Sequence, residues 1–184
     1  MYFKTKELVT LALFGTMAFV VGYILGTALL AATGVPMTGG LLNMVAAVFL
    51  LVTGVKIVNK FGAVIIMTTI LGTLSIPTLV NGTPGVYKVF LLFLLGLIID
   101  ITIYLFKKSN KGIYLGSAIG AFLLPFFMYW TFIFLGMPAA EKLQPLLIPF
   151  MFIYAILALI GAWLGVKFYD KKLKNKAFVK QLQG

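Results

Sequence analysis

The chain has 184 residues, of which 62% are hydrophobic and 10% are charged, and its mean hydropathy is +1.12. Soluble domains carry about 25% charged residues, so a water-soluble fold of this length could not bury so much apolar surface. The absence of cysteine and histidine excludes disulfides, Cys/His metal sites and a Ser-His-Asp triad. The composition therefore predicts one integral membrane domain with no metal site, no cofactor and few groups suited to catalysis.

Six apolar runs are long enough for membrane-spanning helices, which need about 20 residues each. We expect the first run to be a retained helix, because it is longer than the apolar core of a signal peptide, about 7–15 residues. The polar tail at residues 169–184 is either frayed in solvent or a short amphipathic helix on the membrane surface. The predicted fold class is an all-α bundle of six transmembrane helices, covering residues 8–32, 41–58, 61–80, 89–106, 113–135 and 146–168.

The positive charges are distributed unequally between the two sides of the predicted bundle. All 15 cationic residues are lysines, and only Lys88 and Lys142 fall in the connections of one side. The other side, with both termini, carries the rest. Because cytoplasmic connections carry an excess of lysine and arginine, we predict a multi-pass protein of the cell membrane with both termini in the cytoplasm. The net charge of +11 then indicates membrane orientation and contact with anionic lipid rather than nucleic-acid binding.

The connections predicted on the outer side are rich in glycine, proline and hydrogen-bonding groups. Aromatic rings with a few polar groups are typical of a pocket for a flat, polar small molecule. An interfacial aromatic belt explains Tyr87 and Trp130 equally well. The candidate substrate-binding residues are Thr38, Asn43, Asn81, Tyr87, Lys88, Tyr129, Trp130, Glu141 and Gln144.

Asp100 is the one acidic residue expected inside a predicted span. A carboxylate at membrane depth usually faces the bundle interior and serves a function. The sequence leaves two interpretations open, a functional group or a structural polar anchor near the inner interface. Proton coupling would need a second titratable partner at depth, and the sequence shows none.

Small residues recur at four-residue spacing along the first predicted helix. This spacing places them on one face, where they allow another helix to approach closely. That helix belongs either to the bundle itself or to a partner membrane protein. The candidate partner-docking residues are Ala12, Thr16, Ala18, Gly22 and Gly26.

Two short segments near the middle of the chain carry motifs. Residues 52–64 read VTGVKIVNKFGAV, an aliphatic run followed by a basic pair, an aromatic residue and Gly-Ala, and residues 96–100 read GLIID, a glycine before an acid. With six predicted helices and both ends inside, the chain resembles the substrate-binding S components of energy-coupling factor (ECF) transporters. The two motifs resemble those of the thiamine-precursor (YkoE-like) subgroup.

This resemblance implies a transport subunit rather than an enzyme. An S component binds a vitamin or vitamin precursor outside, docks on a membrane T subunit, and releases its cargo inside when two cytoplasmic ATPases power its toppling. The chain lacks the Gly-x-x-x-x-Gly-Lys-Ser/Thr phosphate loop, so it would need those ATPases as partners. One alternative is a stand-alone secondary transporter or channel-like protein, in which Asp100 would matter for flux. Another is a membrane enzyme or assembly factor, although clustered acids or histidines are lacking.

Overall fold

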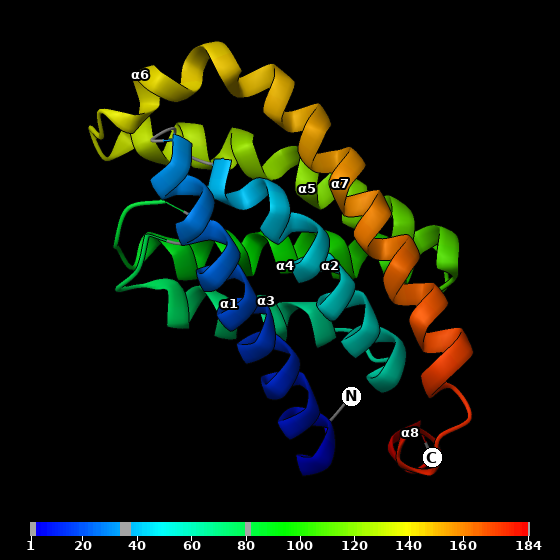
Figure 1. Ribbon diagram of the computed structural model, residues 1–184. Helices are drawn as coiled ribbons and strands as arrows, with labels where there is room; N and C mark the ends of the chain where they lie inside the picture. Colours follow the sequence, from blue (N-terminus) through cyan, green and yellow to red (C-terminus); the bar gives the residue numbers. More distant parts are fainter. Residues whose placement is uncertain (1–2, 34–37, 80–81, 184) are drawn as a thin grey trace.

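The structure is a computed structural model that describes residues 3–33, 38–79 and 82–183. The fold is all-helical, with 85% helix and no strand in these residues. Within the same residues, five helical stretches are long and apolar enough to cross a membrane. The bounds of their long helices agree with the predicted spans to within a few residues. These helices are α1 (Thr5–Thr33), α2 (Thr38–Val58), α4 (Tyr87–Leu105), α5 (Asn110–Phe134) and α7 (Leu147–Phe168), shown in Figure 1.

The helices form a closed ring. Going round it, α1 packs against α2, α2 against α7, α7 against α5, α5 against α4, α4 against α3 (Ala63–Ser75), and α3 against α1. Helix α2 also contacts α3 and α5, and its apolar core is 65% buried, the largest share among the five spans. The ring buries polar side chains such as Asn43, Lys88 and Asp100 among protein atoms.

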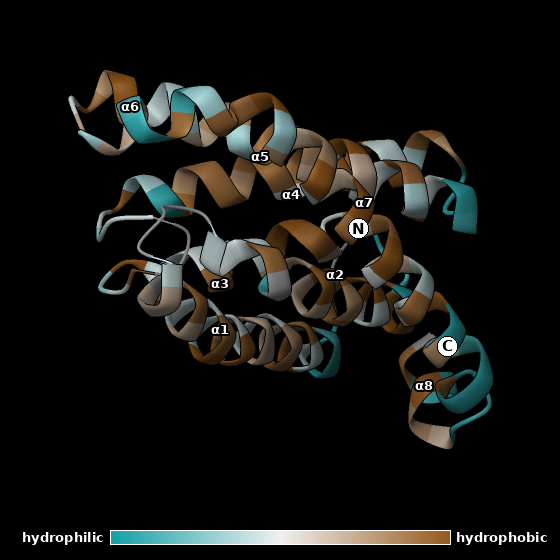
Figure 2. Ribbon diagram, turned by 45° about the horizontal axis from the view of Figure 1, so that its top comes forward, coloured by the Kyte–Doolittle hydropathy of each residue, from teal (hydrophilic) through white to brown (hydrophobic). Residues whose placement is uncertain are grey.

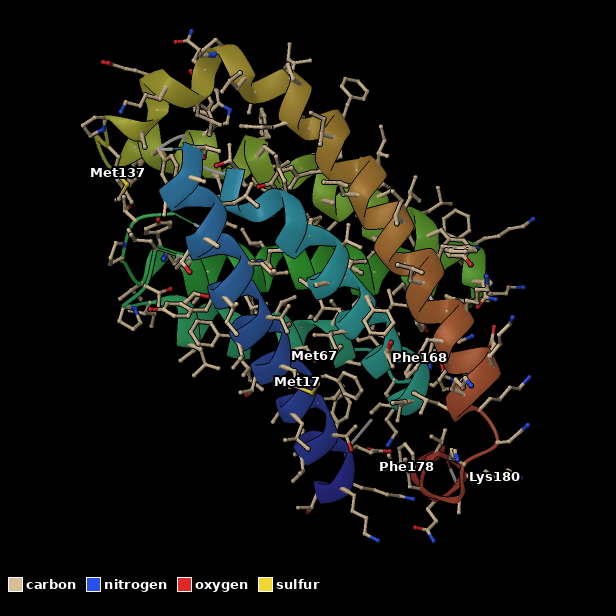
Figure 3. The ribbon with its side chains drawn as sticks, in the orientation of Figure 1. Met17, Met67, Met137, Phe168, Phe178 and Lys180 are labelled. Atoms are coloured by element: carbon tan, nitrogen blue, oxygen red, sulfur yellow. The ribbon has the colours of Figure 1, made fainter. Side chains whose placement is uncertain are left out.

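The two ends of the ring differ in chemistry. One end carries the start of α1, the α2–α3 and α4–α5 connections and the segment after α7, and we call it the lysine-rich end. The other end carries the α1–α2, α3–α4 and α5–α7 connections, and we call it the loop end. Figure 2 shows the long helices mostly hydrophobic between these ends. In Figure 3, Met137 lies at the loop end, and Phe178 and Lys180 lie at the opposite end.

Helix α3 is shorter than the sequence predicted. The predicted span covers residues 61–80, but α3 has 13 residues, about 20 Å at 1.5 Å per residue, whereas a bilayer core is about 30 Å thick. The helix ends because Pro77 has no backbone N–H to donate to the preceding turn. The chain then turns, with the amide of Thr78 donating to the carbonyl of Ser75 at 3.1 Å.

Glycines allow neighbouring helices to touch backbone to backbone. A Cβ atom at Gly161 of α7 would lie 2.6 Å from the carbonyl oxygen of Val45 in α2. A Cβ atom at Gly96 of α4 would lie 2.9 Å from the Cα atom of Ile65 in α3. Any larger residue at these positions would force the helices apart. The close approach of α2 to α7 and of α3 to α4 therefore depends on glycines at these contacts.

The segment after α7 is folded rather than frayed. The π-helix η2 (Tyr169–Leu173) continues α7, and α8 (Ala177–Gln183) follows and contacts α2. Val179 and Leu182 are buried, while Phe178 stays half-exposed. Of the two interpretations left open for the tail, the structure fits the short amphipathic helix, whose apolar side is covered by the protein itself. Part of the predicted loop at 136–145 is also helical, as α6 (Ala139–Leu143) and the 3-10 turn η1 (Gln144–Leu146).

Candidate functional site

The two charged residues of α4 both serve the short helix α3. Asp100 is 2% exposed, and its carboxylate accepts a hydrogen bond from the amide of Ile65 at 3.0 Å. It also accepts from the amide of Val64. These amides belong to the first turn of α3, where backbone N–H groups have no partner within the helix. Asp100 therefore caps the N-terminus of α3 from a neighbouring helix.

The turn into α3 explains why this cap comes from outside the helix. Gly62 occupies the N-cap position with φ of 92° and has no side chain to accept a hydrogen bond. This left-handed conformation is readily adopted by glycine alone. Because the local sequence supplies no capping oxygen, the carboxylate of Asp100 takes that role.

Lys88 serves the other end of α3. Its side chain is 1% exposed, and its ammonium donates to the carbonyl oxygens of Ser75 at 3.0 Å and Thr78 at 2.6 Å. The last carbonyls of a helix are unpaired and carry a partial negative charge. Lys88 was predicted to contact substrate, but it is directed at the backbone where α3 ends.

At the loop end, Tyr87 forms a compact cluster with the α3–α4 connection. Its hydroxyl donates to the carbonyl of Thr83 at 2.7 Å, and its ring meets the edge of Phe132 at 6.2 Å between centroids. The hydroxyl of Thr83 donates to the sulfur of Met137 at 3.1 Å. This cluster, made of Thr83, Tyr87, Phe132 and Met137, joins α4, α5 and the α5–α7 connection.

Asn43 of α2 has a different environment. It is 7% exposed, and its side chain lies against Gly22 of α1, where a Cβ atom would be 2.7 Å from the amide. Its Oδ1 atom is buried and has no hydrogen-bond partner among the described residues. One turn away, the Tyr154 hydroxyl of α7 lies against Gly40. An amide and a phenol are thus buried in the half of the ring nearer the loop end.

The remaining predicted substrate-binding residues are not gathered around one centre. Tyr129 and Trp130 are adjacent on α5 with ring centroids 6.0 Å apart, and Trp130 is 53% exposed. Glu141 and Gln144 are exposed on the α5–α7 connection. Thr38 begins α2, and its hydroxyl lies 2.5 Å from that of Thr33. Asn81 lies outside the described residues.

The predicted docking residues of α1 are divided between two environments. Ala18, Gly22 and Gly26 are buried, and Gly22 and Gly26 face Asn43 and Gly39 of α2. These residues serve the internal contact between α1 and α2, one of the two roles considered from the sequence. On the same helix Ala12 is half-buried and Thr16 is exposed.

A polar cleft of about 210 Å³ opens at the lysine-rich end and includes Asp100 in its wall. Three of its four lysines engage other parts of the chain. Lys60 pairs with the buried Glu7 at 2.7 Å, and Lys108 donates to the carbonyl of Asn59 at 2.9 Å. Lys56 lies 3.6 Å from Asp170. These contacts join the connections at this end to each other.

Sequence reasoning overlooked Thr83, Tyr154 and the pair Glu7–Lys60. Thr83 could have been found from its four-residue spacing to Tyr87. Glu7 could have been found as a carboxylate at the start of an apolar helix, where lysines from other connections converge. Tyr154 gave no such signal, because a tyrosine within an apolar helix is common. The chain matches no family profile, no curated protein and no solved structure.

Proposed function

We propose that this protein is the substrate-binding S component of an ECF-type transporter for a vitamin or vitamin precursor, with a thiamine-related compound as the first candidate. In this proposal α3 and the turn after it count as the third of six passes. Both termini lie in the cytoplasm, so the lysine-rich end faces inward and the loop end faces the substrate. The burial of Lys88 supports this orientation, since only Lys142 then remains in the connections of the loop end.

The observation that carries the proposal is the amide oxygen of Asn43, which has no hydrogen-bond partner among the described residues. A buried acceptor without a donor costs about 1–3 kcal/mol, a cost that a bound molecule with an N–H or O–H group would remove. Asn43 lies in the half of the ring nearer the loop end, where Tyr154 is also buried. A buried phenol and a buried hydrogen-bonding amide in the same half of the ring suit a flat, polar heterocycle.

The contacts of Asp100 support a binding subunit over a stand-alone ion-coupled transporter. Its carboxylate accepts hydrogen bonds from the first turn of α3. Such an acid is a structural anchor in the bundle. Transport energy would then come from other chains, a membrane T subunit and cytoplasmic ATPases.

The exposed face of α1 is the proposed docking surface for the T subunit. It presents Leu13, Met17, Val20 and Ile24, with Thr16 among them. We propose this face as the docking surface in place of the stripe of small residues, because α2 covers that stripe. Leu13→Gln/Met17→Gln should weaken co-purification with a T subunit while leaving solute binding intact.

The test is ligand binding by the purified chain. Mass spectrometry should detect a co-purifying small molecule, and at least one compound among thiamine, its pyrimidine precursor, riboflavin, biotin, pantothenate and folate should raise the melting temperature. Asn43→Leu should abolish that shift without lowering the stability of the ligand-free protein, and the exposed Glu141→Gln should keep it. The proposal fails if no compound binds, or if vesicles containing this chain alone accumulate the solute, which would indicate a stand-alone transporter.

A further inference from the structure

A long apolar groove runs along the outside of the ring, over α2 and between α1 and α7. Its volume is about 820 Å³. Figure 1 shows α2 between α1 and α7. Away from the lysine-rich end, the walls of the groove are apolar and are formed by Leu25, Val45, Ala46, Phe49, Trp163 and Leu164.

The end of this groove is strongly basic. Lys167, Lys171 and Lys172 line it and are exposed. The ammonium of Lys167 lies 4.3 Å from the ring centroid of Trp163. Among the described residues the ion pairs are Lys56–Asp170 and Lys60–Glu7, so no described carboxylate pairs with these three lysines. Three positive charges therefore converge at one end of the apolar groove.

We propose that this groove is a binding site for an anionic phospholipid. An acyl chain lies along the apolar wall formed by α2 and α7, and the phosphate group lies among Lys167, Lys171 and Lys172. A basic pocket at the cytoplasmic ends of transmembrane helices is suited to anionic headgroups. The apolar length of the groove selects a lipid over a soluble phosphate compound, which would leave the walls uncovered. A zwitterionic lipid would place its own cation near the lysines.

The chain carries a natural reporter for this site. It has two tryptophans, Trp163 in the groove and Trp130 on the exposed side of α5. Trp130→Phe leaves Trp163 as the sole tryptophan, and Trp163→Phe leaves Trp130 as a reporter of the surrounding bilayer. Bromine atoms on acyl chains quench tryptophan fluorescence only at contact distance, so quenching measures which lipid lies against each ring.

The experiment uses the full chain in phosphatidylcholine vesicles containing an equal fraction of brominated phosphatidylglycerol or brominated phosphatidylcholine. In the Trp130→Phe protein, we expect the brominated anionic lipid to be enriched at Trp163 by at least about threefold, as charge attraction to three lysines requires. Trp130 should show no headgroup preference. Glycerol phosphate added to the solution should not compete, whereas unbrominated phosphatidylglycerol should.

Charge-matched variants separate the site from general attraction to a basic protein. Lys167→Gln/Lys171→Gln/Lys172→Gln should abolish the enrichment at Trp163. Lys4→Gln/Lys6→Gln/Lys111→Gln removes the same charge from exposed lysines at the same end and should preserve it. Because all the substituted lysines are exposed, we expect both triple variants to fold. The double variant Lys171→Gln/Lys172→Gln should already reduce the enrichment.

Four results would overturn the proposal, the first three of which concern the headgroup. These three are equal quenching of Trp163 by both lipids, equal loss of enrichment in the two triple variants, and competition by soluble glycerol phosphate. A fourth is protection of Trp163 from every brominated lipid, which would indicate a protein helix in the groove. None of these results depends on which solute the chain binds.

Discussion

Asp100 and Lys88 lie on the same helix, α4, and bind the opposite ends of the same neighbour, α3. Asp100 accepts from the amide of Ile65 at the N-terminus, and Lys88 donates to the carbonyl of Ser75 at the C-terminus. Along α4 the two residues are about 18 Å apart, close to the length of α3, about 20 Å. Each charge has the sign that the helix dipole favours at that end. A helix too short to cross the bilayer core is thereby satisfied at both ends by protein groups.

The role of Asp100 can be tested by removing its acceptor oxygens. Asp100→Leu leaves the first amides of α3 without a partner and should lower the free energy of unfolding by about 1.5–3 kcal/mol, the range for hydrogen bonds to a charged group. Asp100→Asn keeps one oxygen and should lose less. Unfolding by steric trapping in bicelles measures both. Asp170→Asn, at an exposed weak ion pair, is the control, with an expected change below about 1 kcal/mol.

Lys88 should prove structural rather than substrate-binding. Lys88→Met keeps the apolar stem but removes the ammonium, so unfolding should become easier by about 1.5–3 kcal/mol. Hydrogen exchange should also accelerate at the amides of Thr78 and Gly85, which form the turn after α3. Lys142→Met, at an exposed position, should change neither quantity. If Lys88→Met had normal stability but no longer bound the solute, Lys88 would instead be a substrate-binding residue.

The contact between α2 and α7 should be intolerant of side chains at Gly161. A Cβ atom there meets the carbonyl of Val45 at 2.6 Å, and backbone cannot move aside as a flexible side chain can. Gly161→Val should destabilise the protein by about 1–3 kcal/mol, the usual cost of overpacking, and Gly161→Ala by less. Ala28→Val on the exposed face of α1 adds similar bulk and should be nearly neutral. Thermal unfolding in detergent compares the three variants.

The orientation of the chain can be measured directly, because the sequence contains no cysteine and every introduced cysteine is unique. Gln144→Cys, in the α5–α7 connection, should react with a membrane-impermeant maleimide on intact cells. Lys111→Cys, in the first turn of α5, should react only after the membrane is permeabilised. Both positions are exposed, so access across the membrane decides the result. The reverse pattern would invert the proposed topology.

The sequence by itself determined that the chain contains helices long and apolar enough to span a membrane, and where these long helices lie. This was possible because apolar runs of sufficient length have no other stable environment than lipid. It also showed that lysines gather at one end, since exposed charged residues are favoured where the helices leave the bilayer.

The tertiary structure decided how the polar residues inside the bundle are used. The sequence shows an aspartate inside the fourth predicted span and a lysine just before that span, but not their partners, which are backbone groups of a different helix. Likewise, the stripe Ala18–Gly22–Gly26 is visible in the sequence, but only packing shows that α2 covers it. The length of α3 depends on both the local sequence and the tertiary structure. Pro77 ends the helix, and Lys88 from α4 satisfies the carbonyls left without partners. Hydrophobic length is a property of one segment, whereas satisfying a buried polar group requires a second segment brought to it by the fold.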